Sequence, residues 1–305
     1  MYRYRAFGFN IESEFEIAQM LPADFSAEQC DVHVRFGEVS RDMVKEPLQT
    51  YLDSSFGKDE MWCDIEVAEL YVGHGTDIIV QKITDKEEEE GLLQAFITGL
   101  AFGAIMHQRK QIPMHGSCVQ KNGRAVLFTG LSGAGKSSIA AEAIRRGYRL
   151  VTDDVTPVSI RNGAVVAEPS FPQQKLWEDA VDRVGARDKT DHMIYEEDDR
   201  TKFAMNVDEA FLNEETELCA VIQLIPKEGA REGRILIEEV KGLERAVLLQ
   251  LHTYRKYMLV DNESRQRHFQ SCADIAKRLK IAHLFRYEDT PESELLAATE
   301  EFINE

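Results

Sequence analysis

Hydrophobic and polar positions alternate in short runs over roughly the first 85 residues of the chain. These runs lie at residues 2–9, 31–36, 61–71 and 77–82, and turn-rich stretches separate them. Alternation with a period of two residues predicts strands with one buried face. We therefore expect residues 1–88 to form a smaller, mainly β (α+β) N-terminal domain.

The pattern then changes to helical spacing. An acidic run at residues 86–90 begins a predicted helix, and residues 91–109 carry apolar side chains three or four positions apart. The apolar stretch at 92–106 is shorter than the ~20 residues that a membrane span needs. We place a domain boundary near residue 88 and expect no membrane association.

From residue 114 onward, strand and helix patterns alternate. Residues 114–120 and 124–129 predict two strands joined by an Asn122-Gly123 hairpin turn, and residues 138–146 predict a helix that stops at Gly147. The pattern also predicts strands at 148–154, 164–167, 218–225 and 234–239, and helices near 242–251 and 272–279. This order predicts an α/β domain over residues 89–305.

Composition narrows the class of protein. The chain has 305 residues, of which 43% are hydrophobic and 30% are charged, which is typical of a globular protein. Its net charge of −18 and the lack of a basic stripe argue against nucleic acid as a partner. The five scattered cysteines have no C-x-x-C spacing, so we expect reduced packing thiols in a cytoplasmic protein.

A glycine-rich loop lies between the predicted strand at 124–129 and the predicted helix at 138–146. Residues 130–137 read GLSGAGKS and match the Walker A pattern G-x-x-x-x-G-K-[ST] of P-loop proteins. In such loops backbone amides enclose phosphates, the lysine reaches the terminal phosphates and the hydroxyl ligates Mg²⁺. The expected nucleotide-binding residues are Gly130, Ser132, Gly133, Ala134, Gly135, Lys136, Ser137 and Ser138.

Two adjacent carboxylates follow at the end of the predicted strand at 148–154. Phosphoryl transfer requires one group that holds Mg²⁺ and another that orients or deprotonates the attacking hydroxyl. We assign Asp153, with Ser137, to the metal and Asp154 to the nucleophile. The reverse assignment of the two aspartates stays open, because adjacent strand residues face opposite sides.

Several further polar residues are candidates for the same site. His115 lies on the strand that pairs with the loop-bearing strand, although a lone histidine is often only a surface or core residue. The basic residues that could contact the nucleotide or its γ-phosphate are Lys175, Arg200, Lys202 and Arg255. For each of them the alternative is a solvated surface cation.

The order His115-Gly116, hairpin, glycine loop, helix and Asp153-Asp154 resembles the catalytic domain of HPr kinase/phosphorylase over about residues 112–160. The resemblance implies the P-loop kinase fold shared with ATP-dependent phosphoenolpyruvate carboxykinase, with ATP and Mg²⁺ as cofactors and possible homo-oligomers. It also implies catalytic roles for Lys136, Asp153 and Asp154, with His115 supporting the catalytic carboxylate.

The resemblance changes outside this region. A glycine-rich stretch that bacterial HPr kinases carry after their aspartate pair is replaced here by FPQQKLW at residues 171–177. The opening at residues 2–14 is similar to divergent HPr kinase-like proteins that phosphorylate lasso peptide precursors on a C-terminal serine. This similarity implies a ribosomal peptide of the lasso-precursor type as substrate.

Three functions follow from these patterns. The first is an ATP- and Mg²⁺-dependent kinase that acts on a serine of such a peptide, with residues 1–88 as a substrate-binding or accessory domain. The second is a kinase of an HPr-like carrier protein or a small metabolite, which the same residues would serve. The third is a nucleotide-dependent switch or binding module. The sequence leaves the choice of ATP or GTP open, as it does a reverse phosphorylase activity.

Overall fold

Two compact units make up the chain. The computed structural model describes residues 1–84, 89–178, 180–181, 190–197, 200–230 and 233–304. Unit 1 comprises Met1–Pro113 and Tyr254–His268, and unit 2 comprises Met114–Thr253 and Phe269–Glu305. Each unit has its own sheet and its own buried apolar side chains.

Unit 1 contains an eight-stranded mixed sheet. Its strands are β1 (Tyr2–Ala6), β2 (Phe9–Ser13), β3 (Val32–Phe36), β4 (Gln49–Thr50), β5 (Ser54–Phe56), β6 (Glu60–Asp64), β7 (Ala68–Gly73) and β8 (Asp77–Lys82). They are ordered β1-β2-β3-β8-β7-β6-β5-β4, and β3 runs parallel to both β2 and β8. The run at residues 61–71 forms parts of two strands instead of one, because the chain turns at Glu66, whose φ is +69°.

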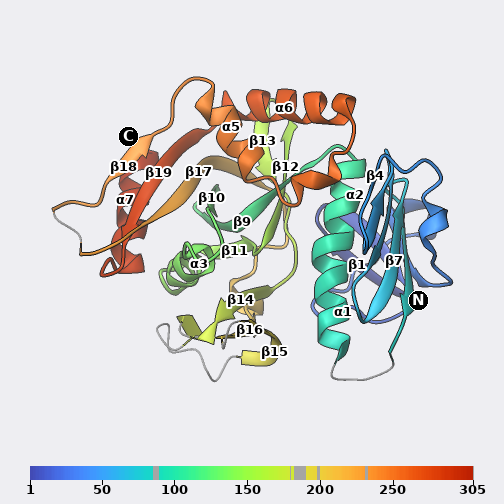
Figure 1. Ribbon diagram of the computed structural model, residues 1–305. Helices are drawn as coiled ribbons and strands as arrows, with labels where there is room; N and C mark the ends of the chain where they lie inside the picture. The colour runs from blue at the N-terminus through green and yellow to red at the C-terminus, as the bar shows by residue number, and fades with distance from the viewer. Residues whose placement is uncertain (85–88, 179, 182–189, 198–199, 231–232, 305) are drawn as a thin grey trace. The chain divides into compact units, whose positions relative to one another are not determined.

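A nearly continuous helical rod accompanies this sheet. It consists of α1 (Glu90–Phe96), the π-helical segment η4 (Ile97–Ala101) and α2 (Phe102–Gln108) (Figure 1). Leu93, Ile97 and Ile105 are buried on it, and α2 contacts β7. The rod therefore groups with the N-terminal sheet, and the first segment of unit 1 ends at Pro113 instead of near residue 88, which itself lies outside the described residues.

The second segment of unit 1 returns from far along the chain. It carries the short helical turn η7 (Lys256–Met258) and the first half of α6 (Asn262–Ala276). The helix predicted near 272–279 is wrong in its bounds. The side chain of Asp261 accepts a hydrogen bond from the Ser264 amide (2.9 Å), which starts α6 earlier in the chain.

Unit 2 contains a second mixed sheet and a small third one. The strands of the second sheet are β9 (Ile112–Lys121), β10 (Arg124–Thr129), β11 (Arg149–Thr152), β12 (Val155–Arg161), β13 (Ala164–Ala167), β17 (Thr216–Lys227), β18 (Ile237–Glu239) and β19 (Lys280–Tyr287). They follow the order β10-β9-β12-β13-β17-β19-β18, with β11 on β9, and β10 also pairs with β17, so that five strands close a ring. The third sheet is β14 (Gln173–Trp177), β16 (Arg200–Asn206) and β15 (Thr190–Glu197) in that order.

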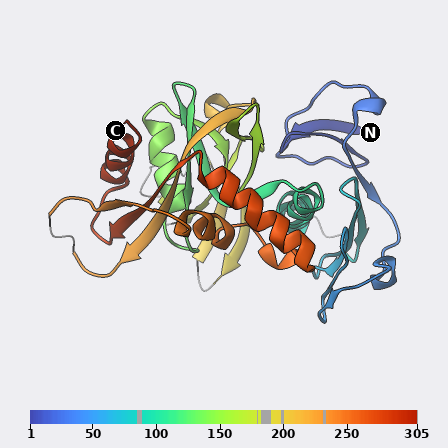
Figure 2. The same ribbon diagram turned by 90° about the horizontal axis from the view of Figure 1, so that it is seen from above.

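Helices cover these sheets. The helix α3 (Lys136–Arg145) contacts β10, β11 and β14, and the C-terminal helix α7 (Glu292–Asn304) lies beside α3 (Figure 2). A further helix is α5 (Glu244–Leu251), and short helical turns occupy Ala27–Gln29, Arg41–Met43 and Asp208–Ala210. Among the described residues no helix combines the length and apolar character that crossing a membrane requires.

Candidate functional site

The glycine loop connects β10 to α3, in the predicted order of strand, loop and helix. Gly130, Gly133 and Gly135 all have positive φ angles, of 146°, 78° and 96°. A Cβ on Gly130 would lie 2.8 Å from the backbone oxygen of Leu224, so the loop approaches β17 too closely for a side chain. These positive φ angles allow the chain to turn tightly between β10 and the first turn of α3.

The loop residues have different surroundings. Ala134 is fully buried and Ser138 is 8% exposed, whereas Ser132 and Gly133 face solvent. The ammonium group of Lys136 donates hydrogen bonds to the backbone oxygens of Gly130 (3.1 Å) and Leu131 (3.0 Å). Lys136 is the first residue of α3, so its positive charge lies at the amide-rich end of that helix.

Asp153 lies directly after β11 and is only 6% exposed. Its carboxylate accepts a hydrogen bond from the Ser137 hydroxyl (3.1 Å), a second from the Ser117 hydroxyl, and a third from the backbone amide of Lys175 (2.7 Å). The donors come from α3, β9 and β14 respectively. The structure thus brings together Ser137 and Asp153, the two residues predicted to hold a metal ion.

Asp154 projects from the turn between β11 and β12. Its φ of +74° is in the left-handed region, which aspartate tolerates better than most residues but which still costs about 1–3 kcal/mol. One carboxylate oxygen is 3.4 Å from His115 Nδ1, and the other is 3.3 Å from Lys175 Nζ. Asp154 and His115 are a quarter and a third exposed, so the carboxylate is reachable from solvent.

Two cations, Lys175 and Arg286, contact residues of this site. The side chain of Lys175 is 11% exposed and pairs with Asp154, so the alternative of a solvated surface cation is wrong for this residue. Arg286, on β19, was not predicted. Its guanidinium donates to the backbone oxygen of Ala134 (3.2 Å) and to Glu292 (3.1 Å), and no local sequence pattern signals this contact across 152 residues.

The remaining predicted cations are not placed at the loop by the structure. Lys202 lies on β16, but its side chain is outside the described part of the chain, and the same holds for Arg200. Arg255 belongs to unit 1, where its guanidinium donates to the hydroxyls of Tyr254 (2.9 Å) and Tyr257 (2.8 Å). Nucleotide contacts by Lys202 and Arg255 therefore stay predictions.

The chemistry of this cluster is that of hydroxyl, carboxylate and cationic groups. Cys118 is on β9 next to Ser117, but burial raises the pKa of its thiol, so it stays protonated and unreactive. Ser137 and Asp153 offer hard oxygen atoms, the kind of ligand that Mg²⁺ prefers. Asp154, held between two basic groups, offers a carboxylate that is able to accept a proton.

Known proteins are similar to this part of the chain. Residues 107–178 match the family model of the HPr Serine kinase C-terminal domain. A 53-residue segment is 43% identical to the HPr kinase/phosphorylase of Clostridium botulinum (strain Eklund 17B / Type B), covering 17% of each chain. A 52-residue segment is 48% identical to that of Treponema pallidum (strain Nichols), covering 17% of this chain and 16% of that protein. The matches thus span about a sixth of the length of these curated relatives.

A search of solved structures found the Hpr(Ser) kinase/phosphatase from Coxiella burnetii. The match has a TM-score of 0.32 and 13% sequence identity, and it covers 63% of this chain and 88% of that chain.

Mixed sheets with helices, a glycine loop at the start of α3 and adjacent carboxylates are the features that define this site. Residues 107–178, which carry the glycine loop, the two carboxylates and part of the second sheet, are HPr kinase-like.

Proposed function

We propose that unit 2 is an ATP- and Mg²⁺-dependent phosphotransferase that phosphorylates a serine hydroxyl. The observation that carries this proposal is the pair of neighbouring carboxylates after β11, of which Asp153 accepts a hydrogen bond from Ser137 on α3. Asp153 accepts hydrogen bonds from Ser137 and Ser117, while Asp154 lies between His115 and Lys175. The two carboxylates therefore have different surroundings, as a metal ligand and a proton acceptor require.

The residues present fit Mg²⁺ and a nucleotide phosphate. Ser137 and Asp153 would hold the metal, because they supply a hydroxyl and a carboxylate within 3.1 Å of each other. The loop glycines and Lys136 would hold the phosphates. A Cβ on Gly133 would meet no atom within 4 Å, so the space outside this turn of the loop is open. When bound, the magnesium nucleotide supplies the phosphoryl group and neutralises its charge.

The side chains of the cluster then have distinct tasks. Asp154 accepts the proton of the acceptor hydroxyl as the oxygen attacks, and Lys175 and His115 hold its carboxylate in place. Lys136 contributes positive charge where negative charge develops during transfer. This assignment makes Asp154 the base and Asp153 the metal ligand, in agreement with their different burial.

The proposal also specifies which molecule accepts the phosphoryl group. We propose the C-terminal serine of a ribosomal peptide of the lasso-precursor type, which rests on the similarity of residues 2–14 to lasso peptide precursor kinases. A second candidate is an HPr-like carrier protein, favoured by the named activity of the HPr kinase/phosphorylases that residues 107–178 resemble.

Substitution of Asp154 tests the reaction. Asp154→Asn keeps the size of the side chain but removes its ability to accept a proton, so the transfer rate should fall by about 10²–10⁴-fold. Binding of Mg-ADP, measured by calorimetry, should stay close to that of the wild type. Transfer at the wild-type rate by Asp154→Asn would show that the base is another group.

Labelled ATP distinguishes the acceptors. The wild-type protein is incubated with a peptide ending in serine, the same peptide ending in alanine, or an HPr-like carrier. Label on the serine peptide alone supports the peptide kinase, and label on the carrier supports the second candidate. Label that appears only as inorganic phosphate under every condition would contradict both and favour a nucleotide-dependent switch.

A further inference from the structure

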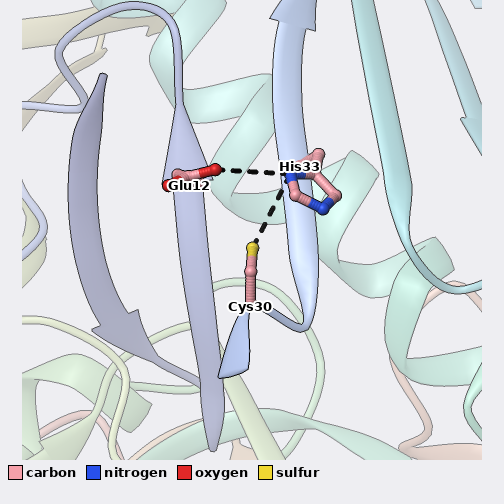
Figure 3. Close-up of side chains that lie close together, drawn as sticks. All are labelled: Glu12, Cys30 and His33. Atoms are coloured by element: carbon pink, nitrogen blue, oxygen red, sulfur yellow. Dashed lines mark hydrogen bonds and ion pairs between the residues drawn. The ribbon is translucent and has the colours of Figure 1, made fainter. Parts of the chain in front are cut away.

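A second group of potential ligands lies in unit 1, on the sheet and not near the glycine loop in sequence. Figure 3 shows Glu12 on β2, His33 on β3 and Cys30 just before β3, with one imidazole nitrogen directed at the other two side chains. His33 Nδ1 is 3.7 Å from Cys30 Sγ and 3.8 Å from Glu12 Oε2. All three ligand atoms lie within 4.8 Å of one another.

The strand register explains why these side chains meet. Glu12 and His33 are directly paired in the parallel ladder of β2 and β3, so their side chains share one face of the sheet. Ile11 and Val32, each one position earlier, are buried on the opposite face. The polar face is therefore set by the same alternation that builds the core.

Hydrogen bonds hold the short segment that contains Cys30 against β2. The backbone amide of Asp31 donates to the carbonyl oxygen of Asn10 (2.8 Å), and the Asn10 amide donates to the Asp31 carboxylate (3.0 Å). The Asn10 side chain also donates to the carbonyl oxygen of Gln29 (2.9 Å). Residues 29–31 are thereby tied to β2, which holds the Cys30 sulfur beside the Glu12–His33 pair.

The Glu12 carboxylate is already oriented. Arg3 Nε and Nη2 donate to Glu12 Oε1 at 3.0 and 2.9 Å, so Oε2 is the oxygen that faces His33. A second charged group that fixes a ligating carboxylate is a recurrent feature of metal sites in proteins. Arg3 would act here as a positioning residue for Glu12.

The distances fit a small tetrahedral ion. With Zn–S near 2.3 Å and Zn–N or Zn–O near 2.0–2.2 Å, neighbouring ligand atoms lie about 3.3–3.6 Å apart. The separations of His33 Nδ1 from Cys30 Sγ and from Glu12 Oε2 exceed this range by only a few tenths of an ångström. Thiolate and imidazole ligands favour Zn²⁺ over Mg²⁺ or Ca²⁺, which prefer oxygen.

We propose that Glu12, Cys30 and His33 form a Zn²⁺ site on unit 1, with a water molecule as the fourth ligand. On binding, the Cys30 sulfur forms a bond to zinc and its proton passes to solvent. His33 binds through Nδ1 and Glu12 through Oε2. This site uses no residue of the proposed phosphotransferase, so the two proposals stand or fall separately.

Cobalt is the probe for this site, because Co²⁺ takes the place of Zn²⁺ and is visible in absorption spectra. The full-length protein is stripped of metal with a chelator and titrated with Co²⁺ in the absence of nucleotide. We expect about one equivalent to produce a thiolate-to-cobalt charge-transfer band and tetrahedral visible bands. Addition of Zn²⁺ should abolish both.

Variants assign the band to these residues. Cys30→Ser should remove the charge-transfer band, and His33→Ala should weaken Co²⁺ binding by about tenfold or more. His33 is 47% exposed, so its replacement leaves the core intact. Cys219→Ser is the matched control, because Cys219 is another half-buried free thiol but lies in unit 2. Asp153→Asn is the control for metal binding at the glycine loop.

The outcomes are distinct. Loss of the charge-transfer band in Cys30→Ser and weaker binding in His33→Ala, with the band retained in Cys219→Ser and Asp153→Asn, support the site. A wild-type protein without the band, or a band that survives in Cys30→Ser, overturns it. Alkylation of Cys30, followed by mass spectrometry, gives a second measurement: equal rates with and without Zn²⁺ would also overturn it.

Discussion

At the scale of single residues, the contact that distinguishes this site is the one between Lys175 and the two carboxylates. The backbone amide of Lys175 donates to Asp153 (2.7 Å), and its ammonium group is 3.3 Å from Asp154. One residue thus holds both carboxylates, through two different groups. Removing the ammonium group leaves the amide contact to Asp153 in place. A substitution of the side chain therefore tests the contact with Asp154 alone.

We predict that Lys175→Met lowers kcat for phosphoryl transfer by about 10²-fold, the cost of losing one charged hydrogen-bond donor in an active site. Mg-ADP affinity should change much less, because Ser137, Asp153 and the loop are untouched. Steady-state kinetics and calorimetry measure the two quantities. Lys277→Met, which removes a surface lysine paired with Asp274, is the control and should behave as the wild type. An equal loss of kcat in both variants would contradict the role of Lys175.

The residues of this site that lie near the loop in the sequence were predictable, whereas the distant ones were not. Ser137 and Asp153 were predicted because the loop motif and the end of the next strand are local patterns. Lys175 was only one of several candidate cations, since nothing in the FPQQKLW stretch shows that β14 packs on α3. The zinc ligands were missed because Glu12 and Cys30 have no recognisable spacing and meet only through strand pairing.

At the scale of elements, the start of α3 depends on a close contact between Gly135 and β19. A Cβ on Gly135 would lie 1.8 Å from Arg286 Nη1, whereas a Cβ on Gly133 would meet nothing within 4 Å. Both glycines have positive φ, so an alanine at either position introduces backbone strain. Only Gly135→Ala also displaces the guanidinium that binds Ala134 and Glu292.

We therefore predict that Gly135→Ala lowers the free energy of unfolding by about 1.5–3 kcal/mol more than Gly133→Ala, the net value of a hydrogen bond to a charged donor. Urea denaturation measures the difference. In an Arg286→Ala background the extra loss should vanish, because the crowded group is gone. If the difference between the two glycine variants persists without Arg286, another contact at the helix start must cause it.

The elements themselves were predictable where local patterns were strong. The strand predicted at 124–129 is β10 without change, since an apolar run lies between a hairpin turn and the glycine loop. By contrast, β19 and α7 were not predicted. In β19, Lys280, His283 and Arg286 interrupt the alternation, and the strand is held by pairing with β17 on one side and β18 on the other. Its existence depends on tertiary contacts that no short window of sequence contains.

At the scale of the whole molecule, the division into units could not be read from the sequence. Unit 1 is built from two segments that are separated by most of unit 2. Their contact is partly polar: His107 on α2 binds the backbone oxygen of Tyr254 through Nε2, at 2.8 Å. A hydrophobic pattern predicts each helix but does not show which element the helix packs against. The boundary predicted near residue 88 therefore separated the helical rod from the sheet that it covers.

The burial of His107 and of its neighbour His268 makes the stability of unit 1 depend on pH. His107 and His268 are 9% and 6% exposed, and their ring centroids are 6.3 Å apart. Burial lowers the pKa of each imidazole from 6.5 to about 4, and for His268 the neighbouring His107 contributes as well. Both are neutral in the folded protein at pH 5.5, whereas in the unfolded chain most would be protonated. The contribution of these neutral imidazoles to the free energy of unfolding is thus fully present above pH 6.5, and it declines as the pH falls toward 4.

Each imidazole should contribute a loss of about 1 kcal/mol in the free energy of unfolding between pH 7 and pH 5.5. The chain has two tryptophans, with Trp62 in unit 1 and Trp177 in unit 2. In a Trp177→Phe background, Trp62 fluorescence during urea denaturation reports unit 1 alone. His107→Gln removes one titrating group and the repulsion it would exert on a protonated His268, so its stability should fall less over this pH range. If the two proteins lose equal stability on acidification, carboxylates elsewhere in unit 1, and not this histidine pair, determine its response to acid.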